Sequence, residues 1–382
     1  NVVSAACVGQ ASCSIAANNA TFGDPCAGTL KQLAVQALCA AAGAPASAGR
    51  SSSGATGAGG SGPVSNPPAP AGAGGSTASG TTGRPSWNTG QGFFASGGKL
   101  YDANGVEFVM EGTNHTHWWG GTNEQAIPYL SNANANAVRA VFGPGGGATT
   151  PELRESIVRQ YIAQRIVPVV DYHNATCDES PASLDAAVDL WVGADKAWLQ
   201  SLERYVILNI TNEWGPNSTV WRDAYKSAIL RLRQAGVKNL LMIDAGGACG
   251  QLAESVEAWG REVFDSDPEK NVVFSIHQYG FWVDPGSPLA GTRDGRQPDD
   301  IDAELTRLAA TGLPLVVGEF SWSAFNQVTY TTRAALASYE KHGIGWLSWM
   351  WNNPGGDPSV NMATTNVYNT SSDLTDFGRL LI

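Results

Sequence analysis

Short apolar runs alternate with longer polar segments from residue 90 to the end of the chain. Each run is almost continuously apolar, which is typical of strands buried on both faces of a parallel sheet. The eight runs are residues 106–112, 137–142, 166–172, 205–210, 240–244, 272–277, 315–318 and 344–349. Eight such strands separated by covering segments predict an α/β fold, the (β/α)8 TIM barrel.

Several segments between the runs have the length and spacing of amphipathic helices. Helices are predicted over residues 219–235, 301–310 and 332–342. In the first of these, Ala224, Ile229 and Leu232 recur at helical spacing, so we expect them to face the sheet. An open doubly wound sheet is the competing architecture, but it usually carries a glycine-rich phosphate turn after its first strand. Here that turn reads Gly112-Thr-Asn-His115, without such a motif.

The composition changes before the barrel segment. Between residues 41 and 84, all but four residues are Ala, Gly, Pro, Ser or Thr. Such a segment has almost no apolar surface to bury, so we expect residues 41–88 to be a disordered, flexible linker. A flexible chain of this length has an end-to-end distance of roughly 35–40 Å. The sequence therefore predicts a tether between the barrel domain, residues 89–382, and a separate N-terminal segment.

Four of the six cysteines lie in that N-terminal segment. They are Cys7, Cys13, Cys26 and Cys39, and no CxxC pair occurs among them, so a zinc site is not favoured. We expect residues 1–40 to be disulfide-rich, because so short a segment buries little core without cross-links. Disulfides indicate an oxidising compartment, and we expect a secreted, extracellular protein.

Charge and hydropathy exclude several classes of partner. The chain of 382 residues has 23 Lys and Arg against 34 Asp and Glu, a net charge of −11, and it has no basic run. Such a chain is unsuited to nucleic acid or to an anionic membrane surface. No apolar run approaches the roughly 20 residues of a membrane helix. The chain begins at Asn1 without a hydrophobic leader, so we expect that a signal segment has been removed.

Acidic residues end two of the predicted strands. In a barrel of this kind, functional side chains gather at the mouth where the strands end. Glu213 ends the fourth strand and Glu319 the seventh, so the two carboxyl groups are expected to face each other across a ligand. Glycosidic bond cleavage needs such a pair, one group as proton donor and the other as nucleophile or activator of water. The pair is roughly 5–5.5 Å apart in retaining enzymes and roughly 6.5–9.5 Å apart in inverting ones.

The neighbours of Glu319 are those of an ionised nucleophile. Arg139 on the second strand and Tyr279 after the sixth are placed to reach its carboxylate. A guanidinium group and a phenol hydrogen bond favour the charged form. Gly318, directly before the acid, is interpreted as allowing close approach of substrate.

The neighbours of Glu213 are those of a proton donor. It lies between Asn212 and Trp214, and we expect His277 nearby. An apolar wall and an adjacent anion raise the pKa of a carboxyl group, as a proton donor requires. Asn212 is expected to hydrogen-bond a sugar hydroxyl in the transition state.

The motifs at the strand ends resemble those of one enzyme family. The segment Ile207-Leu-Asn-Ile-Thr-Asn-Glu213-Trp is similar to the strand-four signature of retaining glycosidases with barrel folds. Glycoside hydrolase family five is resembled by Phe274-Ser-Ile-His277-Gln-Tyr279, Val317-Gly-Glu319-Phe and Gly345-Trp-Leu-Ser-Trp349. Its bacterial-type endo-β-1,4-mannanases are resembled by Asn114-His-Thr-His117-Trp118, Tyr172-His173-Asn-Ala-Thr176 and Leu241-Met-Ile-Asp-Ala245.

This resemblance implies an enzyme that hydrolyses β-1,4-mannosidic bonds in mannan, glucomannan or galactomannan by retaining double displacement. Glu213 is then the acid/base and Glu319 the nucleophile. The substrate-binding residues are expected to be Arg139, His173, Asn212, His277, Tyr279, Trp349, Trp351, His117 and Trp118. The resemblance implies no cofactor and no metal. We expect the polysaccharide substrate to be the partner of a monomeric enzyme.

Some positions depart from the pattern of these mannanases. They are Glu111, Gln278 and Gly280-Phe281-Trp282, and residues 281–300 form a long insertion rich in Pro, Gly and charge. These differences lie around the expected groove, so they bear on which polymer fits it. A second resemblance concerns the N-terminus, where Cys7-Val-Gly-Gln-Ala-Ser-Cys13 and Phe22-Gly-Asp-Pro-Cys26 resemble the end of a galactose/rhamnose-binding lectin domain of the sea-urchin-egg type. A sugar-binding fragment and a vestigial module are both open.

Several alternatives remain at this point. A β-1,4-glucanase uses the same set of subsite residues, and a carbohydrate-binding protein without turnover would use the same aromatic groove. His115, His117 and His173 suggest a metal site, although hydrogen-bonding roles are favoured because no carboxylate completes a local cluster. Cys177 and Cys249 follow strands on the same face, so a disulfide is expected, with two buried thiols as the alternative. About half of Trp118, Trp119, Trp282 and Trp322 are expected to line subsites.

Overall fold

The computed structural model of the chain describes residues 83–279, 301–321, 329–356 and 358–382. The predictions for residues 1–40, for most of the linker, for the insertion at 281–300 and for Trp322 lie outside these residues. The boundaries of the three predicted domains therefore stay predictions.

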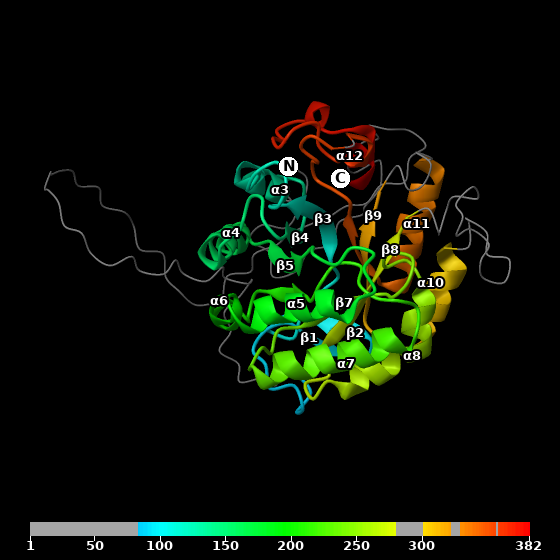
Figure 1. The fold of residues 1–382 in the computed structure, drawn as a ribbon. Coiled ribbons are helices and arrows are strands. Elements are labelled where there is room, and N and C mark those ends of the chain that lie inside the picture. The colour runs from blue at the N-terminus through cyan, green and yellow to red at the C-terminus, as the bar shows by residue number, and fades with distance from the viewer. Residues whose placement is uncertain (1–82, 280–300, 322–328, 357) are drawn as a thin grey trace, which may run out of the picture. The chain divides into compact units, whose positions relative to one another are not determined.

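Eight parallel strands close into a barrel, as the sequence predicts (Figure 1). Their order around the barrel is β10-β3-β4-β5-β6-β7-β8-β9, so each strand pairs with its neighbour in sequence and the last pairs with the first. The strands are β3 (Glu111–Thr116), β4 (Ala137–Phe142), β5 (Val167–Tyr172), β6 (Ile207–Asn209), β7 (Leu241–Asp244), β8 (Val272–Gln278), β9 (Leu315–Phe320) and β10 (Gly345–Ser348).

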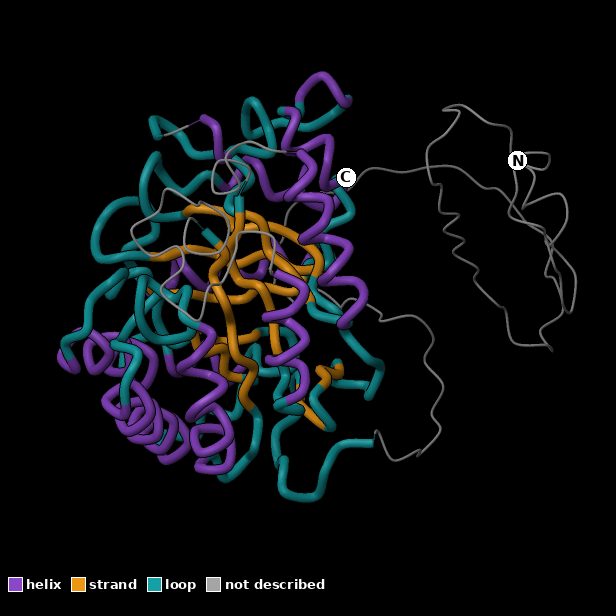
Figure 2. Tube along the Cα trace, turned by 90° about the vertical axis from the view of Figure 1, so that its right-hand side faces the viewer, coloured by secondary structure: helices purple, strands orange, loops and turns teal. Residues whose placement is uncertain are grey.

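Helices surround the strands, which lie at the centre of the described fold (Figure 2). They are α3 (Ile127–Asn132), α4 (Pro151–Ala163), α5 (Pro181–Val192), α6 (Lys196–Ser201), α7 (Thr219–Gln234), α8 (Ala253–Ser266), α10 (Ile301–Ala310), α11 (Thr329–His342) and α12 (Asp376–Leu381). Short 3-10 helices are η1 (Glu124–Ala126), η3 (Pro358–Val360) and η4 (Ser371–Asp373). In the part of the chain that the structure describes, no helix is both long enough and apolar enough to cross a membrane.

Helix α7 illustrates how local sequence sets an element. The Ser218 hydroxyl accepts a hydrogen bond from the Val220 amide and caps the first turn. Ile229 and Leu232 are buried, as predicted, while Ala224 is half-buried. Ala228 and two larger side chains, Trp221 and Tyr225, are buried on the same helix. The predicted spacing is correct for Ile229 and Leu232, and two aromatic residues that it did not single out are buried with them.

Alternate strand residues fall into two separate apolar clusters. Val138, Val170 and Leu208 belong to the cluster between strands and helices, whereas Ala137 and Val169 belong to the cluster inside the barrel. This alternation is the two-residue period of a strand. Residues two positions after these interior residues therefore also point into the barrel, nearer the ends of the strands. Arg139 follows Ala137 in this way, and Asp171 follows Val169.

A hairpin seals the apolar end. Strands β1 (Phe94–Ser96) and β2 (Lys99–Tyr101) pair antiparallel, and Ala95 and Leu100 pack in the interior cluster. The Asn271 side chain fixes the hairpin, accepting from the Ala95 amide at 3.0 Å and donating to the Phe93 carbonyl at 3.1 Å. The barrel is therefore closed by apolar packing at the end where the strands begin.

The first predicted strand was misplaced. The apolar run at 106–112 only overlaps β3, which extends to Thr116. The Phe108 amide instead donates to the Leu100 carbonyl, so the run belongs largely to the floor of the barrel. The strand continues into polar sequence because its side chains are bonded internally: Asn114 Nδ2 donates to the Gly318 carbonyl at 2.9 Å, and His115 Nδ1 lies 2.6 Å from the Tyr161 hydroxyl.

Candidate active site

The barrel interior changes from apolar to polar toward the strand ends. Val169 is followed two residues later by Asp171, and Met242 is followed likewise by Asp244. Arg139 occupies this polar layer on β4 and is fully buried. Burying a charge without partners is very unfavourable, so each of these groups needs a counter-charge or hydrogen bonds.

Arg139 is the hub of the polar layer. Its Nη1 donates to Glu319 Oε1 at 2.6 Å and its Nη2 to Asn212 Oδ1 at 2.6 Å. Its Nε donates to Asn209 Oδ1 at 2.7 Å, and Nη2 lies 3.3 Å from Asp171 Oδ1. One guanidinium therefore contacts side chains from three strands or the segments directly after them, β5, β6 and β9.

Glu319 receives a hydrogen bond at each carboxylate oxygen. Arg139 donates to Oε1, and the Tyr279 hydroxyl donates to Oε2 at 2.7 Å. Burial raises the pKa of Tyr279 well above its usual value, so the phenol keeps the proton that it donates. The two predicted neighbours of Glu319 are thus in contact with it, and both stabilise its negative charge.

Glu213 has a different environment. It follows β6 with a left-handed backbone, φ 49°, and its amide donates to Asp244 Oδ2 at 2.9 Å. Its Oε1 lies 2.8 Å from Nδ1 of His277, the neighbour that the sequence predicts. Burial raises the pKa of the Glu213 carboxyl; the His277 hydrogen bond opposes this effect, and the negative charge of Glu319 adds to it.

His277 lies between the two acids. Its Nδ1 is 2.8 Å from Glu213 Oε1 and 3.6 Å from Glu319 Oε2. Burial lowers its pKa, but Glu319, Asp244 and Glu213 outweigh burial and raise the pKa to about 9. The surrounding carboxylates therefore favour the protonated imidazole, and its Nδ1 hydrogen bond goes to Glu213 Oε1.

The two carboxyl groups meet at one place in the mouth. A carboxylate oxygen of Glu213, a ring nitrogen of His277 and a carboxylate oxygen of Glu319 all lie within 4.8 Å of one another. This spacing fits a pair that acts on the two atoms of one glycosidic bond without a water molecule between the carboxyl groups. The arrangement combines a carboxyl group with a hydrogen-bond donor on each oxygen and a second carboxyl group whose pKa burial raises, a pair suited to acid-assisted displacement.

Asn212 and His173 are hydrogen-bonded to each other and are held in place by neighbouring side chains. His173 Nδ1 donates to Asp171 Oδ2 at 2.8 Å, which leaves its Nε2 to accept from Asn212 Nδ2 at 3.0 Å. Asn212 Nδ2 also donates to Thr176 Oγ1 at 2.9 Å. Both hydrogens of the amide are therefore used within the protein, and the predicted bond to a sugar hydroxyl stays a prediction.

Aromatic rings line one side of this mouth. The Trp349 and His173 rings stack with centroids 5.6 Å apart, and Trp349 lies 6.1 Å from Trp119. Trp118, Trp119 and Trp349 are each half-buried, so part of each ring is accessible. These rings have the flat apolar surface that sugar faces contact.

The predictions of substrate binding by Trp351 and His117 are wrong, because both side chains are enclosed by the protein. Trp351 is fully buried in the core between barrel and helices and packs against Tyr368, with centroids 6.2 Å apart. His117 is also fully buried, and it bonds the Tyr161 hydroxyl and the Thr122 carbonyl. Burial lowers the pKa of His117 to about 4, so it is a neutral structural group.

Two interpretations of neighbouring residues also change. A Cβ on Gly318 would lie 2.2 Å from Ser275 Oγ and 3.2 Å from His277 Nε2, so this glycine makes room for β8 and not for substrate. Trp214 is fully buried and packs against Tyr225 in the core between barrel and helices, so it is a core residue. The predicted disulfide between Cys177 and Cys249 is present, and its sulfurs lie beside Glu213 instead.

Sequence reasoning missed the buried acids Asp171 and Asp244 as site residues. Asp244 accepts from the Glu213 amide, lies 3.6 Å from His277 Nε2 and lies 3.7 Å from Arg139 Nη2. The available clue was an aspartate at the end of an otherwise apolar run, as in Val169-Val170-Asp171 and Met242-Ile243-Asp244.

The described residues contain two groups that are close enough to share a metal ion, and both include Glu213. One is Glu213 with His277 and Glu319, and the other is Glu213 with Cys177 and Cys249, whose sulfurs are joined. The three histidines considered as a metal site serve other contacts, because His115 and His117 bond Tyr161 while His173 bonds Asp171.

Comparisons with known proteins agree with this architecture. Residues 101–355 match the family model for cellulase, glycosyl hydrolase family 5. A mannan endo-1,4-beta-mannosidase of Salipaludibacillus agaradhaerens is 36% identical over 267 residues, covering 68% of this chain and 81% of that protein. One of Streptomyces lividans is 34% identical over 271 residues, covering 69% of this chain and 67% of that protein.

Solved structures give the same result. The catalytic domain of a mannanase from Streptomyces sp. SirexAA-E has a TM-score of 0.65 at 30% identity, covering 76% of this chain and 90% of that one. A mannohexaose complex of Thermomonospora fusca beta-mannanase has a TM-score of 0.64 at 29% identity, covering 76% and 93%.

The N-terminal segment has its own match. Residues 1–39 match the model of the D-galactoside/L-rhamnose binding SUEL lectin domain. A D-galactoside-specific lectin of Heliocidaris crassispina is 53% identical over 38 residues, which cover 10% of this chain and 36% of that lectin. The predicted lectin resemblance therefore holds for a part of such a domain.

Proposed function

The chain belongs to glycosyl hydrolase family 5, and from this premise we propose that it is a secreted, retaining endo-β-1,4-mannanase. Support for the substrate comes from its relatives, since those of Salipaludibacillus and Streptomyces are named mannan endo-1,4-beta-mannosidases. Support for the retaining course comes from one observation, the approach of Glu213 and Glu319 oxygens to within 4.8 Å.

In the first step Glu319 attacks the anomeric carbon of the sugar. A bond forms between its carboxylate oxygen and that carbon, and the bond to the glycosidic oxygen breaks. Glu213 gives its proton to the departing oxygen, which leaves as a neutral hydroxyl group. Arg139 and Tyr279 hold the attacking carboxylate ionised and oriented, so little reorganisation is needed at the moment of reaction.

In the second step the same acid acts as a base. Once Glu319 is esterified, its negative charge is gone, and that charge is one of the causes that raise the pKa of Glu213. The pKa of Glu213 therefore falls when the intermediate forms, and its carboxylate is ready to take a proton from water. The water oxygen bonds to the anomeric carbon and the ester bond to Glu319 breaks, which regenerates both groups.

The substrate is tested by a product profile on linear mannan, galactomannan, glucomannan and carboxymethylcellulose. We expect oligosaccharides of several lengths from linear mannan and much slower release from carboxymethylcellulose. Faster release from carboxymethylcellulose would favour a β-1,4-glucanase, a possibility raised by a relative named beta-mannanase/endoglucanase A at 29% identity. Binding to mannan with no product on long incubation would favour a carbohydrate-binding protein without turnover.

Secretion is supported by the Cys177–Cys249 disulfide, since such bonds persist in oxidising compartments. Fractionation of the producing cells tests it, and we expect mannan-hydrolysing activity in the medium. Activity confined to the cell interior would contradict this part of the proposal.

A further inference from the structure

We propose that the Cys177–Cys249 disulfide is a positioning element for Glu213, so that its reduction slows every step in which Glu213 moves a proton. The inference rests on the proposed acid/base role of Glu213. It concerns two residues that take no part in the chemistry but lie against a residue that does.

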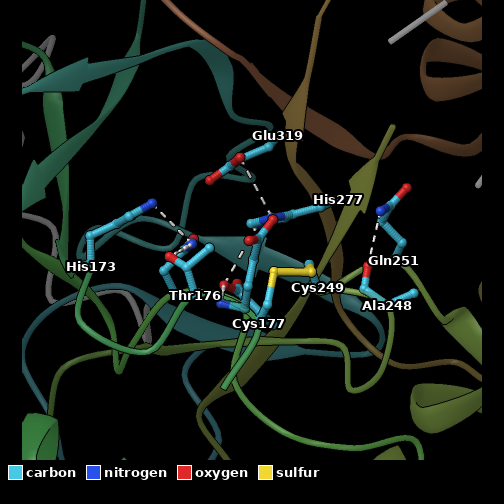
Figure 3. The surroundings of a disulfide bond; sticks show 11 residues. His173, Thr176, Cys177, Ala248, Cys249, Gln251, His277 and Glu319 are labelled. Carbon is cyan, nitrogen blue, oxygen red and sulfur yellow. Dashed lines mark hydrogen bonds and ion pairs between the residues drawn. A yellow bond between two sulfur atoms is a disulfide. The ribbon is translucent and has the colours of Figure 1, made fainter. Parts of the chain in front are cut away.

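The disulfide joins two loops on either side of Glu213. Cys177 belongs to the loop after β5 and Cys249 to the loop after β7, while Glu213 follows β6, the strand between them. Both sulfurs and a carboxylate oxygen of Glu213 lie within 4.8 Å of one another. Figure 3 shows the bond between the loop of His173 and Thr176 and the loop of Ala248 and Gln251, close to His277.

The backbone of the second loop forms the wall of the acid. A Cβ on Gly250 would lie 3.2 Å from Glu213 Cγ and 3.3 Å from His277 Cγ, and the Gly250 carbonyl accepts from the His277 amide at 3.0 Å. A small shift of this loop therefore moves both Glu213 and the imidazole that bonds it. It also admits water to a carboxyl group that is only 7% exposed.

That loop has an unfavourable backbone. Gly247, Ala248, Cys249 and Gly250 are consecutive left-handed residues, with φ of 78°, 46°, 56° and 77°. Residues other than glycine adopt this region at a cost and stay in it only where the surroundings hold them. The disulfide is the covalent restraint on this stretch, so breaking it allows the loop to relax.

Reduction does not remove the other anchors of these loops. The Gly215 amide donates to the Asp178 carbonyl at 2.9 Å, and the Gly247 amide donates to the Gly215 carbonyl at 2.7 Å. The barrel hydrogen bonds of β5, β6 and β7 are also independent of the sulfurs. We therefore expect a folded reduced protein with a displaced acid.

Reagents have access to the bond, because Cys177 is exposed. A dithiol such as dithiothreitol supplies two electrons and two protons. It becomes a cyclic disulfide, and the Cys177–Cys249 bond becomes two thiols. The reagent also reaches the cysteines of residues 1–40, so a control is needed. The Cys177→Ser/Cys249→Ser double variant is therefore treated with dithiothreitol in parallel, and the treatment should not lower its activity further.

The first experiment measures mannan hydrolysis by the full-length protein before reduction, after reduction and after reoxidation, with circular dichroism at each stage. We expect a reversible, roughly 10- to 100-fold fall in kcat, the size caused by misplacing a reacting group. Unchanged kcat in the reduced protein would overturn the proposal. An oxidised protein without activity on mannan would instead contradict the proposed function.

The second experiment separates positioning from general damage. With a dinitrophenyl β-mannoside, the leaving group needs no proton, so the burst that reports attack by Glu319 should be unchanged in the double variant. The later steady state, which needs Glu213 as base, should fall. Equal losses in burst and steady state would contradict a role at Glu213.

The pH profile and a matched control complete the test. Burial raises the pKa of Glu213, so water entry lowers it, and the alkaline limb of kcat/KM should move to lower pH in the double variant. Asn239→Ala is the control, because it removes a buried hydrogen bond to the Val206 carbonyl at the far end of β7. Asn239→Ala should lower thermal stability and leave kcat and the alkaline limb of kcat/KM unchanged. If Asn239→Ala moves that limb as far as the double cysteine variant does, the disulfide has no special role.

Discussion

The two carboxyl groups of the mouth are the same residue type in opposite environments. Glu319 receives a bond from a buried guanidinium and another from a phenol, one on each oxygen. Among the described residues, the carboxyl group of Glu213 is bonded by His277 alone, and it lies against a disulfide. The first environment replaces water with fixed donors, and the second mainly removes water.

This difference supports the two proposed roles without reference to sequence position. Donors on both oxygens favour the ionised form, which a nucleophile requires. Burial favours the protonated form, which an acid requires. Asp244 lies between the two environments, because it bonds the Glu213 backbone and lies near Arg139. The following predictions test this comparison, from the largest expected effect to the smallest.

Removal of each acid should give different residual chemistry. Glu319→Ala should lower kcat on mannan on the order of 10⁶-fold, and Glu213→Gln by about 10²- to 10⁴-fold. With azide and an activated aryl mannoside, Glu319→Ala should form the α-glycosyl azide and Glu213→Ala the β-glycosyl azide. NMR of the products checks this, and the reverse pattern would exchange the two roles.

Loss of Arg139 should affect both stability and activity. Arg139→Met leaves Asp171, Asp244 and Glu319 without their buried cation, so we expect a stability loss of about 3–5 kcal/mol. We also expect a fall in kcat of about 10²- to 10³-fold, as for loss of an electrostatic donor. Urea unfolding and kinetics measure the two effects. Arg231→Met, which breaks exposed pairs with Asp185 and Asp189, is the control and should cost below about 1 kcal/mol.

The pH profile should respond to changes beside Glu213 and not to changes beside Glu319. The His277 hydrogen bond and charge lower the pKa of Glu213, so His277→Gln should raise that pKa and move the alkaline limb of kcat/KM to higher pH. Tyr279→Phe should lower kcat by roughly 10- to 150-fold, as expected for a hydrogen bond to a charged group, and leave the limb in place. A limb that moves with Tyr279→Phe and not with His277→Gln would contradict the comparison.

The smallest effect concerns the aromatic side. Trp349→Ala should raise KM roughly 3- to 10-fold, because ring contacts of this kind contribute about 0.5–1.5 kcal/mol. Trp351→Phe should lower thermal stability with KM unchanged, because that ring lies in the core. An equal rise of KM in both variants would show that the two tryptophans are not distinguished by their exposure.

Regular, repeated features of the fold could be predicted from sequence. The run at 137–142 and the helix at 301–310 have the observed bounds, because continuous apolar runs and helical spacing report burial directly. The first strand could not be placed, because β3 continues through Asn114 and His115. Their burial depends on partners such as Gly318 and Tyr161, which are far away in the sequence.

The site residues could likewise be predicted only in part from the sequence. Glu213, Glu319, Arg139, Tyr279 and His277 were found together because strand ends meet at one mouth. Trp351 was misassigned because the chain beyond β10 no longer alternates as a strand. There the Trp351 amide donates to the Asn114 carbonyl, and its own carbonyl accepts from Ala363. Which side of such a segment faces the groove depends on packing by distant residues.

The central claim is that Glu213 and Glu319 act together on one glycosidic bond and that the configuration of the anomeric carbon is retained. Proton NMR during the first minutes of hydrolysis of a mannooligosaccharide tests it most directly, because the anomeric form of the new reducing end is seen before mutarotation. The account predicts that the β-anomer appears first and the α-anomer follows slowly. Initial appearance of the α-anomer would contradict it.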